Sequence, residues 1–363
     1  MEADSNPASS LPSTTLTFST PFPVSSYRLI EVSKDLAEKF KNGEKFIARG
    51  NPTANMTLCT KNETFRCRDV EITNTILLTE KMDPAVSKEE LKINYASKEY
   101  LELVQEEGTP YLALKDLLSQ NQFDFLDGFG PDKIWYTMDE LLEVIQFSEE
   151  EIKKTLKEMP VVELDGTLRY LCRNVRSFLL NTLVEALDDE SLSEVDLEKV
   201  NFEGLRRQFD ETVDDCFVHW IMRAYLNPDH SVNQLSICRD RAIIVLEKEH
   251  EISQEAFNRQ MLTLLPEGMD FNPEALRGIA IVNESIVRGR MYDYINVEDL
   301  PSIPKARLDL LFKIRDSWIL EDLEPYVLDF CPNKSAVMPF LLKYCQQIKE
   351  GSNKVFVKRD DDF

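Results

Sequence analysis

The sequence is poor in the residues and motifs that most enzymes use for catalysis or nucleotide binding. Its 363 residues include 3 histidines and 11 glycines, and neither GxxxxGK(S/T) nor GxGxxG occurs in it. No GxSxG, HExxH or Cys/His cluster is present either. The lack of a phosphate-binding loop excludes a P-loop ATPase. We therefore expect a protein that is not an enzyme and that carries no cofactor and no metal ion.

Long apolar runs and paired cysteines are also lacking. The longest apolar runs, 242–246 and 279–282, fall far short of the ~20 residues that a membrane span needs. The N-terminus has no basic and apolar leader, and the seven cysteines are odd in number and include no CxxC pair. We expect an intracellular protein with reduced thiols and no membrane contact.

A surplus of positive charge is absent as well. Lys and Arg number 42 against 65 Asp and Glu, so the net charge is −23. A protein that coats nucleic acid uniformly is basic, so any DNA contact here must use a local patch. Runs such as Asp188-Asp189-Glu190 leave a metal-dependent nuclease as an alternative, but adjacent residues on a helix do not face each other.

The N-terminal part reads as a series of short strands. Residues 1–13 are rich in Ser, Pro and Ala and predict a disordered lead-in. Strands are expected at 14–20, 27–32, 45–49, 56–60, 64–72 and 75–80, with a helix at 33–41. Residues 14–95 thus predict a small β-barrel or half-barrel that is too small to close alone and is completed by partner chains. The candidate residues for this β-pairing are Phe65, Val70, Ile72, Ile76 and Leu78.

Helical patterns follow, so the predicted fold class is α+β. Residues 96–133 predict a helical linker with helices at 99–104 and 112–119 and a hinge at 128–131. Thr137 and Ser148 are expected to cap two helices, the second of them at 149–159. Asp165-Gly166 then predicts a hairpin of strands 161–164 and 168–171. Helix, helix and hairpin together indicate a winged-helix domain at 134–196.

We expect two further winged-helix domains, at 197–252 and at 253–363, the last with a C-terminal extension. The expected helices are 202–209, 214–225, 241–250, 254–265, 273–278, 305–318, 321–330 and 335–348. The expected strands are 234–238, 279–282, 290–297 and 354–358.

A winged helix presents a helix and its hairpin to a DNA duplex. Residues 134–200 hold seven basic against sixteen acidic residues and so favour no DNA contact, whereas 253–363 hold fourteen against eighteen. The candidate phosphate contacts are Lys334, Lys343, Lys349, Lys354, Lys358 and Arg359, with Arg288 and Arg290 as a second group. The alternative is ordinary solvated lysines, which the acidic run 360–362 favours.

Several blocks in the C-terminal half resemble a known family. They are Leu265-Pro266-Glu267-Gly268-Met269, 276–282, 297–301, Arg315-Asp316-Ser317-Trp318, 321–326 and 341–344. The similarity continues at 136–151 and runs collinearly to 354–357. Together these blocks resemble the "defective in sister chromatid cohesion" family of accessory subunits of an alternative replication factor C clamp loader.

The resemblance implies a non-catalytic adaptor. Its N-terminal strands would complete a barrel with a very small accessory subunit and with the C-terminal tail of the loader's large ATPase subunit. The winged helices would bind single- and double-stranded DNA and the catalytic subunit of DNA polymerase epsilon. The loader acts on the PCNA clamp, so the family implies a hetero-oligomer in the nucleus that serves DNA replication and sister chromatid cohesion.

One feature departs from the family pattern, and one rival hypothesis stays open. The family can carry a basic stretch after the strand domain, where this chain has the acidic Gln105-Glu106-Glu107-Gly108. This shifts the expected DNA contact toward the C-terminal basic residues. The rival is a winged-helix scaffold that binds only proteins and makes no DNA contact, which the overall acidity favours.

Overall fold

The computed structural model describes residues 14–23, 27–50, 55–81, 90–126, 133–190, 192, 195–285, 287–351 and 353–359. The chain divides into two units, Met1–Glu106 and Glu107–Phe363. The expected disordered lead-in at 1–13 and hinge at 128–131 lie outside the described residues. Within these ranges, no helix has both the length and the apolar character to span a bilayer.

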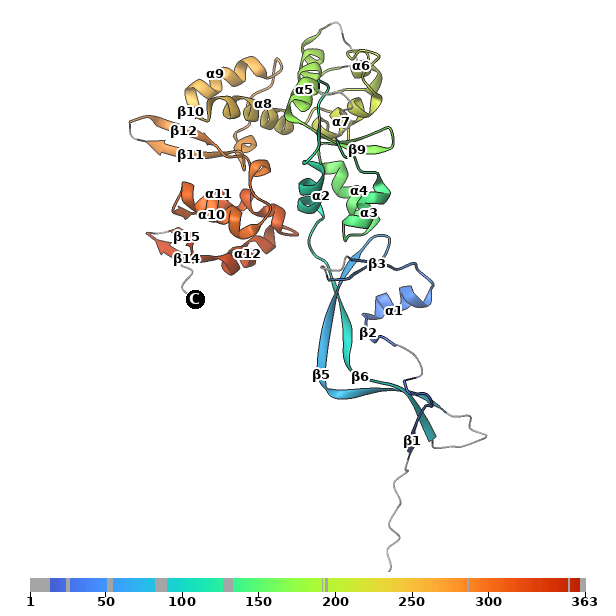
Figure 1. Cartoon of the computed structure of the whole chain (residues 1–363). Coiled ribbons are helices and arrows are strands. Elements are labelled where there is room, and N and C mark those ends of the chain that lie inside the picture. Colours follow the sequence, from blue (N-terminus) through green and yellow to red (C-terminus); the bar gives the residue numbers. More distant parts are fainter. Residues whose placement is uncertain are drawn as a thin grey trace, which may run out of the picture. The chain divides into compact units, whose positions relative to one another are not determined.

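The described part of the first unit forms one six-stranded sheet and one short helix. The sheet order is β1 (Thr15–Phe18), β6 (Glu90–Gln105), β5 (Thr64–Lys81), β4 (Thr57–Cys59) and β3 (Ile47–Arg49), with β2 (Ile30–Glu31) also pairing with β6. Helix α1 (Lys34–Lys41) begins after Ser33, whose hydroxyl accepts the Leu36 N–H at 3.2 Å. The described strands form an open sheet and not a closed barrel (Figure 1).

A long ribbon of β5 and β6 dominates this sheet, and it corrects two expectations. The strands expected at 64–72 and 75–80 form one continuous strand, β5. The helix expected at 99–104 is wrong, because these residues lie in β6 and pair antiparallel with β5 from Phe65 opposite Gln105 onward. A register shift between Glu71 and Ile76 interrupts the pairing, and β5 and β6 bend together (Figure 1).

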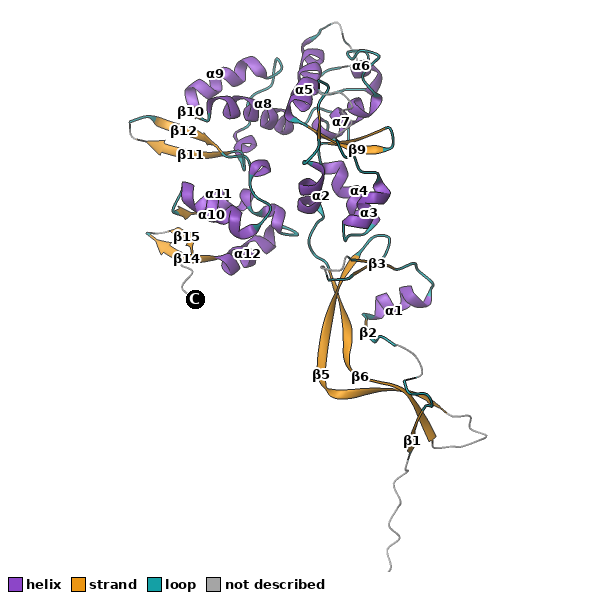
Figure 2. Cartoon of the chain, viewed as in Figure 1, coloured by secondary structure: helices purple, strands orange, loops and turns teal. Residues whose placement is uncertain are grey.

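The second unit repeats one plan three times: helix, strand, one or more helices, and a two-stranded hairpin (Figure 2). The first copy comprises α2 (Tyr111–Leu118), β7 (Gln122–Phe123), α3 (Met138–Val144), α4 (Glu149–Glu158), β8 (Val161–Leu164) and β9 (Thr167–Leu171). The second comprises α8 (Gln234–Glu249), β10 (Glu251–Ser253), α9 (Gln254–Leu264), the 3₁₀ turn η1 (Pro273–Leu276), β11 (Ala280–Ser285) and β12 (Gly289–Tyr294). The third comprises α10 (Pro304–Ile314), β13 (Ser317–Trp318), α11 (Leu320–Leu323), α12 (Val337–Tyr344), β14 (Cys345–Glu350) and β15 (Asn353–Lys358).

The three copies also share one sheet order. In each of them the last strand lies between the first strand and the other hairpin strand: β7-β9-β8, β10-β12-β11 and β13-β15-β14. Short 3₁₀ turns η3 (Glu324–Tyr326), η4 (Leu328–Phe330) and η5 (Lys334–Ala336) join α11 to α12, and η2 (Val297–Asp299) follows the second copy. The repeat therefore extends to the strand order, but β7 pairs parallel with β9, whereas β10 and β13 pair antiparallel with β12 and β15.

Local signals in the first copy are confirmed. Thr137 and Ser148 each form a capping box, in which the cap hydroxyl accepts the backbone N–H of Glu140 or Glu151 and that glutamate accepts the cap N–H. Asp165 and Gly166 have φ of 52° and 72° and form the tight turn between β8 and β9. These turns depend on neighbours within three residues, which is why the sequence predicts them well.

Residues between the first two copies form helices α5 (Arg173–Asp188), α6 (Phe202–Arg206) and α7 (Asp215–Tyr225). Helix α5 is not among the helices expected from the sequence. The expected strand at 234–238 is wrong, because Asn233 caps α8 there by accepting the Ser236 N–H. The largest hydrophobic cluster joins β9, α5 and α7 through buried residues such as Leu171, Leu179 and Val218.

The helix expected at 335–348 ends earlier than predicted. Helix α12 stops at Tyr344, and Cys345 begins β14, which pairs with β15 from Cys345 opposite Lys358 to Glu350 opposite Asn353. The expected final strand at 354–358 is confirmed within β15. The pairing of β14 with β15 ends α12 at this point, and local sequence does not show this pairing.

Candidate partner-binding and DNA-binding surfaces

The outer edge of β5 is the longest uncovered sheet edge in the described part of the first unit. Strand β4 covers it only where Thr57–Cys59 pair with Thr64–Arg66, and the Cys67 N–H donates to the Met56 carbonyl just beyond. From residue 68 to residue 81, no described strand pairs with this edge. Such an edge presents unpaired backbone donors and acceptors and is a template for another chain.

The five β-pairing candidates lie on this strand in different settings. Phe65 is 8% exposed and packs inside the sheet, whereas Val70 and Ile72 are half-buried. Ile76 and Leu78 are 37% and 36% exposed, opposite Ser97 and Tyr95 of β6. Ile76 and Leu78 are therefore the candidates that a partner strand could cover most directly.

The ribbon around Ile76 shows apolar side chains on both faces. Successive side chains of a strand point to opposite faces, so Leu77, also exposed, faces away from Ile76 and Leu78. The buried apolar side chains described in this unit are few: Leu36, Cys59, Phe65, Cys67 and Ile93. Where only β5 and β6 are paired, the described sheet has little buried core, and its exposed apolar side chains are available to another chain.

A second apolar surface in this unit was not expected from the sequence. Leu16 and Phe18 of β1 are exposed, and β1 pairs parallel with the start of β6. The two residues alternate with threonines in the sequence, which is the period-two signal that could have identified them. The exposed apolar area is thus broader than the five candidates.

The structure brings some of the C-terminal basic residues together. Lys349 of β14 and Lys354 of β15 lie directly opposite each other in the hairpin, and both are exposed. Like charges directly opposite each other on a strand pair destabilise it. An anion at this hairpin would relieve that repulsion.

Other candidates have partners within the chain. Lys358 forms an ion pair with Asp309 at 2.7 Å, and Lys334 pairs with Glu324 at 3.4 Å. Arg359 donates to the carbonyls of Leu342, Lys343 and Cys345 and so closes the C-terminal end of α12. Arg359 therefore has a structural role. The Lys343 side chain, on the segment that Arg359 holds, is exposed.

Arg288 and Arg290 lie in the β11–β12 hairpin, which belongs to a different copy. Arg288 pairs with Glu251 at 2.7 Å. Arg290 stands opposite Glu284 in the strand register, and none of the described ion pairs includes it. Arg288 and Arg290 are thus on a different hairpin from Lys349 and Lys354, which lie on β14 and β15.

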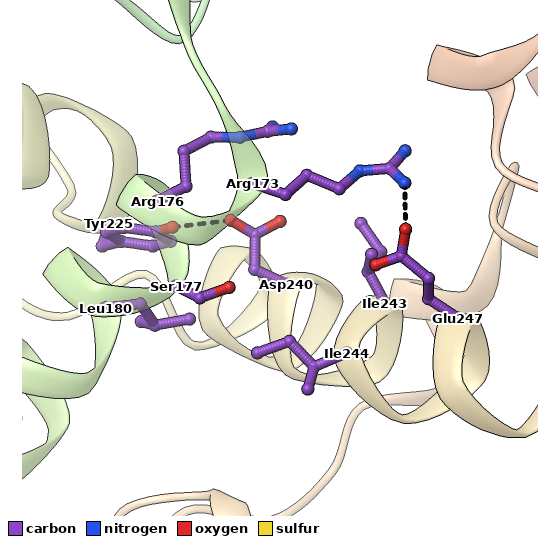
Figure 3. A pocket seen from close by; sticks show the side chains of 9 residues that line it. All are labelled: Arg173, Arg176, Ser177, Leu180, Tyr225, Asp240, Ile243, Ile244 and Glu247. Atoms are coloured by element: carbon purple, nitrogen blue, oxygen red, sulfur yellow. Dashed lines mark hydrogen bonds and ion pairs between the residues drawn. The ribbon is translucent and has the colours of Figure 1, made fainter. Parts of the chain in front are cut away.

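Charged side chains of α5 and α8 lie close together beside Tyr225 of α7 (Figure 3). Arg176 of α5 also pairs with Glu298 of η2. Arg173 pairs with Glu247, and the Tyr225 hydroxyl donates to the Asp240 carboxylate at 2.6 Å. Burial raises the pKa of Asp240, and the Tyr225 hydrogen bond opposes that shift. The cavity among these side chains is about 30 Å³, so the cluster acts as a packed junction.

Neither thiol chemistry nor a metal cluster stands out in the described residues. Burial raises the pKa of Cys345 to about 11 and that of Cys216 to about 12, so both thiols stay protonated at neutral pH. Across the described ranges, no group of three or more His, Cys, Asp or Glu side chains is placed to hold a metal ion.

The chain thus combines an open sheet that has an uncovered edge with a threefold repeat of helices, a strand and a hairpin. The chain belongs to the family described as sister chromatid cohesion protein Dcc1, whose sequence model matches residues 27–327. It is 28% identical to mouse sister chromatid cohesion protein DCC1 across 91% of this chain and 86% of the mouse protein. The human and budding-yeast proteins of that name are 27% and 24% identical, over 91% and 92% of this chain.

Proposed function

We propose that this chain acts in sister chromatid cohesion as a non-catalytic adaptor subunit of the alternative replication factor C clamp loader. In this proposal the loader acts on PCNA in the nucleus, and the adaptor links it to DNA and to polymerase epsilon during DNA replication. Family membership supports the role in cohesion, because the relatives carry that name. The partners are inferred from the family resemblance.

The observation that carries the adaptor role is the uncovered β5–β6 ribbon. Its outer edge from residue 68 to residue 81 has no described partner strand, and Ile76, Leu77 and Leu78 are exposed on its two faces. A partner strand that covers this edge would pair the free backbone groups and bury these side chains together. We infer that the small accessory subunit and the tail of the large subunit complete the sheet into a barrel.

The threefold repeat supports the second half of the proposal. The order helix, strand, one or more helices and hairpin, with the last strand in the middle of each sheet, is compatible with tandem winged helices. The exposed Lys349–Lys354 pair gives the third copy a basic hairpin for phosphate contact. The first copy would serve a protein partner, for which we propose the polymerase.

Co-expression with the two candidate partner chains tests the adaptor role. We expect a 1:1:1 complex in size-exclusion chromatography for the wild type. Ile76→Asp and Leu78→Asp should each lower recovery of the small partner at least about tenfold, because a charge at a buried interface centre costs more than ~1.4 kcal/mol.

The matched control is Ile303→Asp, since Ile303 is exposed in the second unit and stands at the N-cap of α10, where Asp is favoured. This variant should keep the complex. Wild-type recovery of the small partner by both ribbon variants would contradict β-pairing at this edge.

A protein-binding scaffold without DNA contact is the second candidate. The net charge of −23 and the acidic first copy favour it. Retention on a DNA column separates the two candidates, provided that the variants with reversed charge at Lys349 and Lys354 still bind the partner chains. Equal retention of the variants and the wild type would favour the scaffold.

A further inference from the structure

The hydroxyl group of Tyr326, in η3, is buried and has no hydrogen-bond partner among the described residues. The side chain is 2% exposed, and its ring makes an edge-to-face contact with Trp318, with the ring centroids 5.8 Å apart. Burial raises the pKa of the Tyr326 hydroxyl, so this group stays protonated and can donate a hydrogen bond. A buried hydroxyl without a partner is unfavourable, because it has lost its bonds to water and has gained none in return.

Tyr326 lines a cavity of about 150 Å³ between the second and third copies of the repeat. The second copy contributes Leu276 of η1 and Tyr292 of β12 to its walls, and the third contributes Trp318 of β13 and Tyr326. Leu276 and Tyr292 belong to one hydrophobic cluster, and Trp318 and Tyr326 belong to another. The cavity therefore lies at the seam between two cores, and its walls include two aromatic rings besides that of Tyr326.

Contacts across this seam hold the walls in place. The Arg315 guanidinium, at the end of α10, donates to the Val282 carbonyl of β11 at 3.3 Å. Arg277, which follows η1, forms an ion pair with Glu324 of η3 at 3.4 Å. The fold thus forms the cavity in advance, so a ligand would spend little binding energy on ordering it.

The charged residues that line the cavity balance each other. They are exposed, and they comprise two cations and two anions: Arg277, Arg290, Glu321 and Asp322. Their exposure makes the cavity accessible from solvent, and their balance favours a neutral ligand over an ion. The unpartnered Tyr326 hydroxyl adds one hydrogen-bonding group to a wall that is otherwise largely aromatic and aliphatic.

We propose that this cavity binds one phenol ring, the side chain of a tyrosine from a protein partner. An apolar cavity of roughly this volume holds one benzene-sized ring and is too small for a nucleotide. The ring of the ligand would pack against Trp318 and Tyr292, and its hydroxyl would be the missing partner of the Tyr326 hydroxyl.

A partner protein is the source that we assign to this ring. Aromatic side chains that fill small pockets anchor many protein interfaces, and tyrosine is enriched among such anchors. The assignment is independent of the adaptor role, since it uses neither the β5–β6 ribbon nor the Lys349–Lys354 hairpin.

Fluorine NMR with two matched probes tests the site on the full chain. The probes are 4-fluorophenol and fluorobenzene, which share one ring and differ by a hydroxyl group, and both should bind the wild type. Tyr326→Phe should lower the affinity for 4-fluorophenol by about two- to tenfold, because one hydrogen bond is lost, and should leave the affinity for fluorobenzene unchanged. The control Tyr225→Phe removes a hydroxyl outside this cavity and should change neither affinity.

Urea unfolding without a ligand gives a second measurement. Tyr326→Phe should be at least as stable as the wild type, since it removes a buried hydroxyl that has no partner. Tyr225→Phe should be less stable, since it breaks the hydrogen bond to Asp240. An equal loss of stability in both variants would show that the Tyr326 hydroxyl already has a partner in the folded chain, and would overturn the proposal.

Blocked amino acids test whether the ring can belong to a protein. N-acetyl-tyrosinamide should displace 4-fluorophenol from the wild type, and N-acetyl-phenylalaninamide should do so less well. Binding of 4-fluorophenol without displacement by N-acetyl-tyrosinamide would overturn the assignment to a partner's tyrosine. If neither fluorinated probe binds the wild type, the site itself is refuted.

Discussion

Replacing Glu298 with glutamine should destabilise the second unit strongly, because this carboxylate is the partner of Arg176 at the packed junction. The two side chains are mostly buried and meet at 3.2 Å between η2 and α5. With an effective dielectric constant of about 20, two unit charges at this distance attract by roughly 5 kcal/mol. The cost of desolvating the two charges offsets part of this attraction, and glutamine keeps a hydrogen-bond acceptor. We therefore expect the free energy of unfolding to fall by about 2–3 kcal/mol.

The same variant should change the acid sensitivity of the protein. Burial alone would raise the pKa of the Glu298 carboxyl, but pairing with Arg176 outweighs it, so the pKa lies below the ordinary value of 4.5. The native state then binds fewer protons than the unfolded state between the two pKa values. The carboxylate therefore contributes its stability above pH 4.5 and loses it as the pH falls through the lower, native value.

Urea unfolding from neutral pH down to pH 3 measures both effects. The difference between the wild type and Glu298→Gln should be constant above about pH 5 and shrink below pH 4.5. Arg176→Met alone and combined with Glu298→Gln completes a double-mutant cycle for the coupling energy. A loss of stability below about 0.5 kcal/mol would show that the pair contributes no more than an exposed ion pair does. A stability difference between the variant and the wild type that stays constant down to pH 3 would show that the Glu298 carboxyl is not the group responsible.

Two further predictions concern the hairpin of the third copy and a glycine of the second. Reversing the charge of both Lys349 and Lys354 should abolish retention on duplex DNA and lower the salt dependence of binding by about two ions. Lys349→Glu alone should leave the hairpin folded, because the new glutamate lies opposite the positive Lys354. Unchanged retention of the double variant would rule out this hairpin as the DNA contact. Gly278→Ala should lower the urea midpoint by an amount equivalent to about 1–2 kcal/mol, since φ is +74° and the new Cβ would lie 3.2 Å from the Cβ of Pro325. The control is Gly351→Ala, whose φ of +59° is similarly left-handed but whose added Cβ has no atom within 4 Å, so the difference between the variants isolates the contact.

Signals confined to a few residues predict this fold best. The capping boxes at Thr137 and Ser148 and the turn at Asp165 are confirmed because neighbouring backbone groups determine them. Helix α5 carries buried Val175 and Leu179 four residues apart, so a signal for it existed in the sequence. The assumed spacing of the repeat hid that signal.

Features that depend on distant segments were harder to predict. Helix α8 is buried on several sides, so the stretch at its start lacks a clean helical stripe and resembles a strand. The end of β6 carries an apolar spacing that suits a short helix, but pairing with β5 makes it a strand. In both cases tertiary contacts override the local pattern.

The candidate sites divide in the same way. The sequence identifies the apolar side chains of β5 and the basic residues near the C-terminus, because residue type alone suggests them. It cannot show that Lys349 faces Lys354 or that Arg359 is used to hold the end of α12.

The three hairpins share one topology and differ in charge, and this difference accounts for how so acidic a chain could contact DNA. The β8–β9 hairpin carries Glu163 and Asp165, and its one arginine, Arg169, is buried beneath Trp135. Phosphates would be repelled there. The β14–β15 hairpin instead presents Lys349 and Lys354 side by side. Surface charges more than about 10 Å apart are largely screened at physiological salt, so a local basic hairpin attracts phosphates despite the net charge of −23. The first copy is then left for a protein partner, and DNA contact is expected from the last.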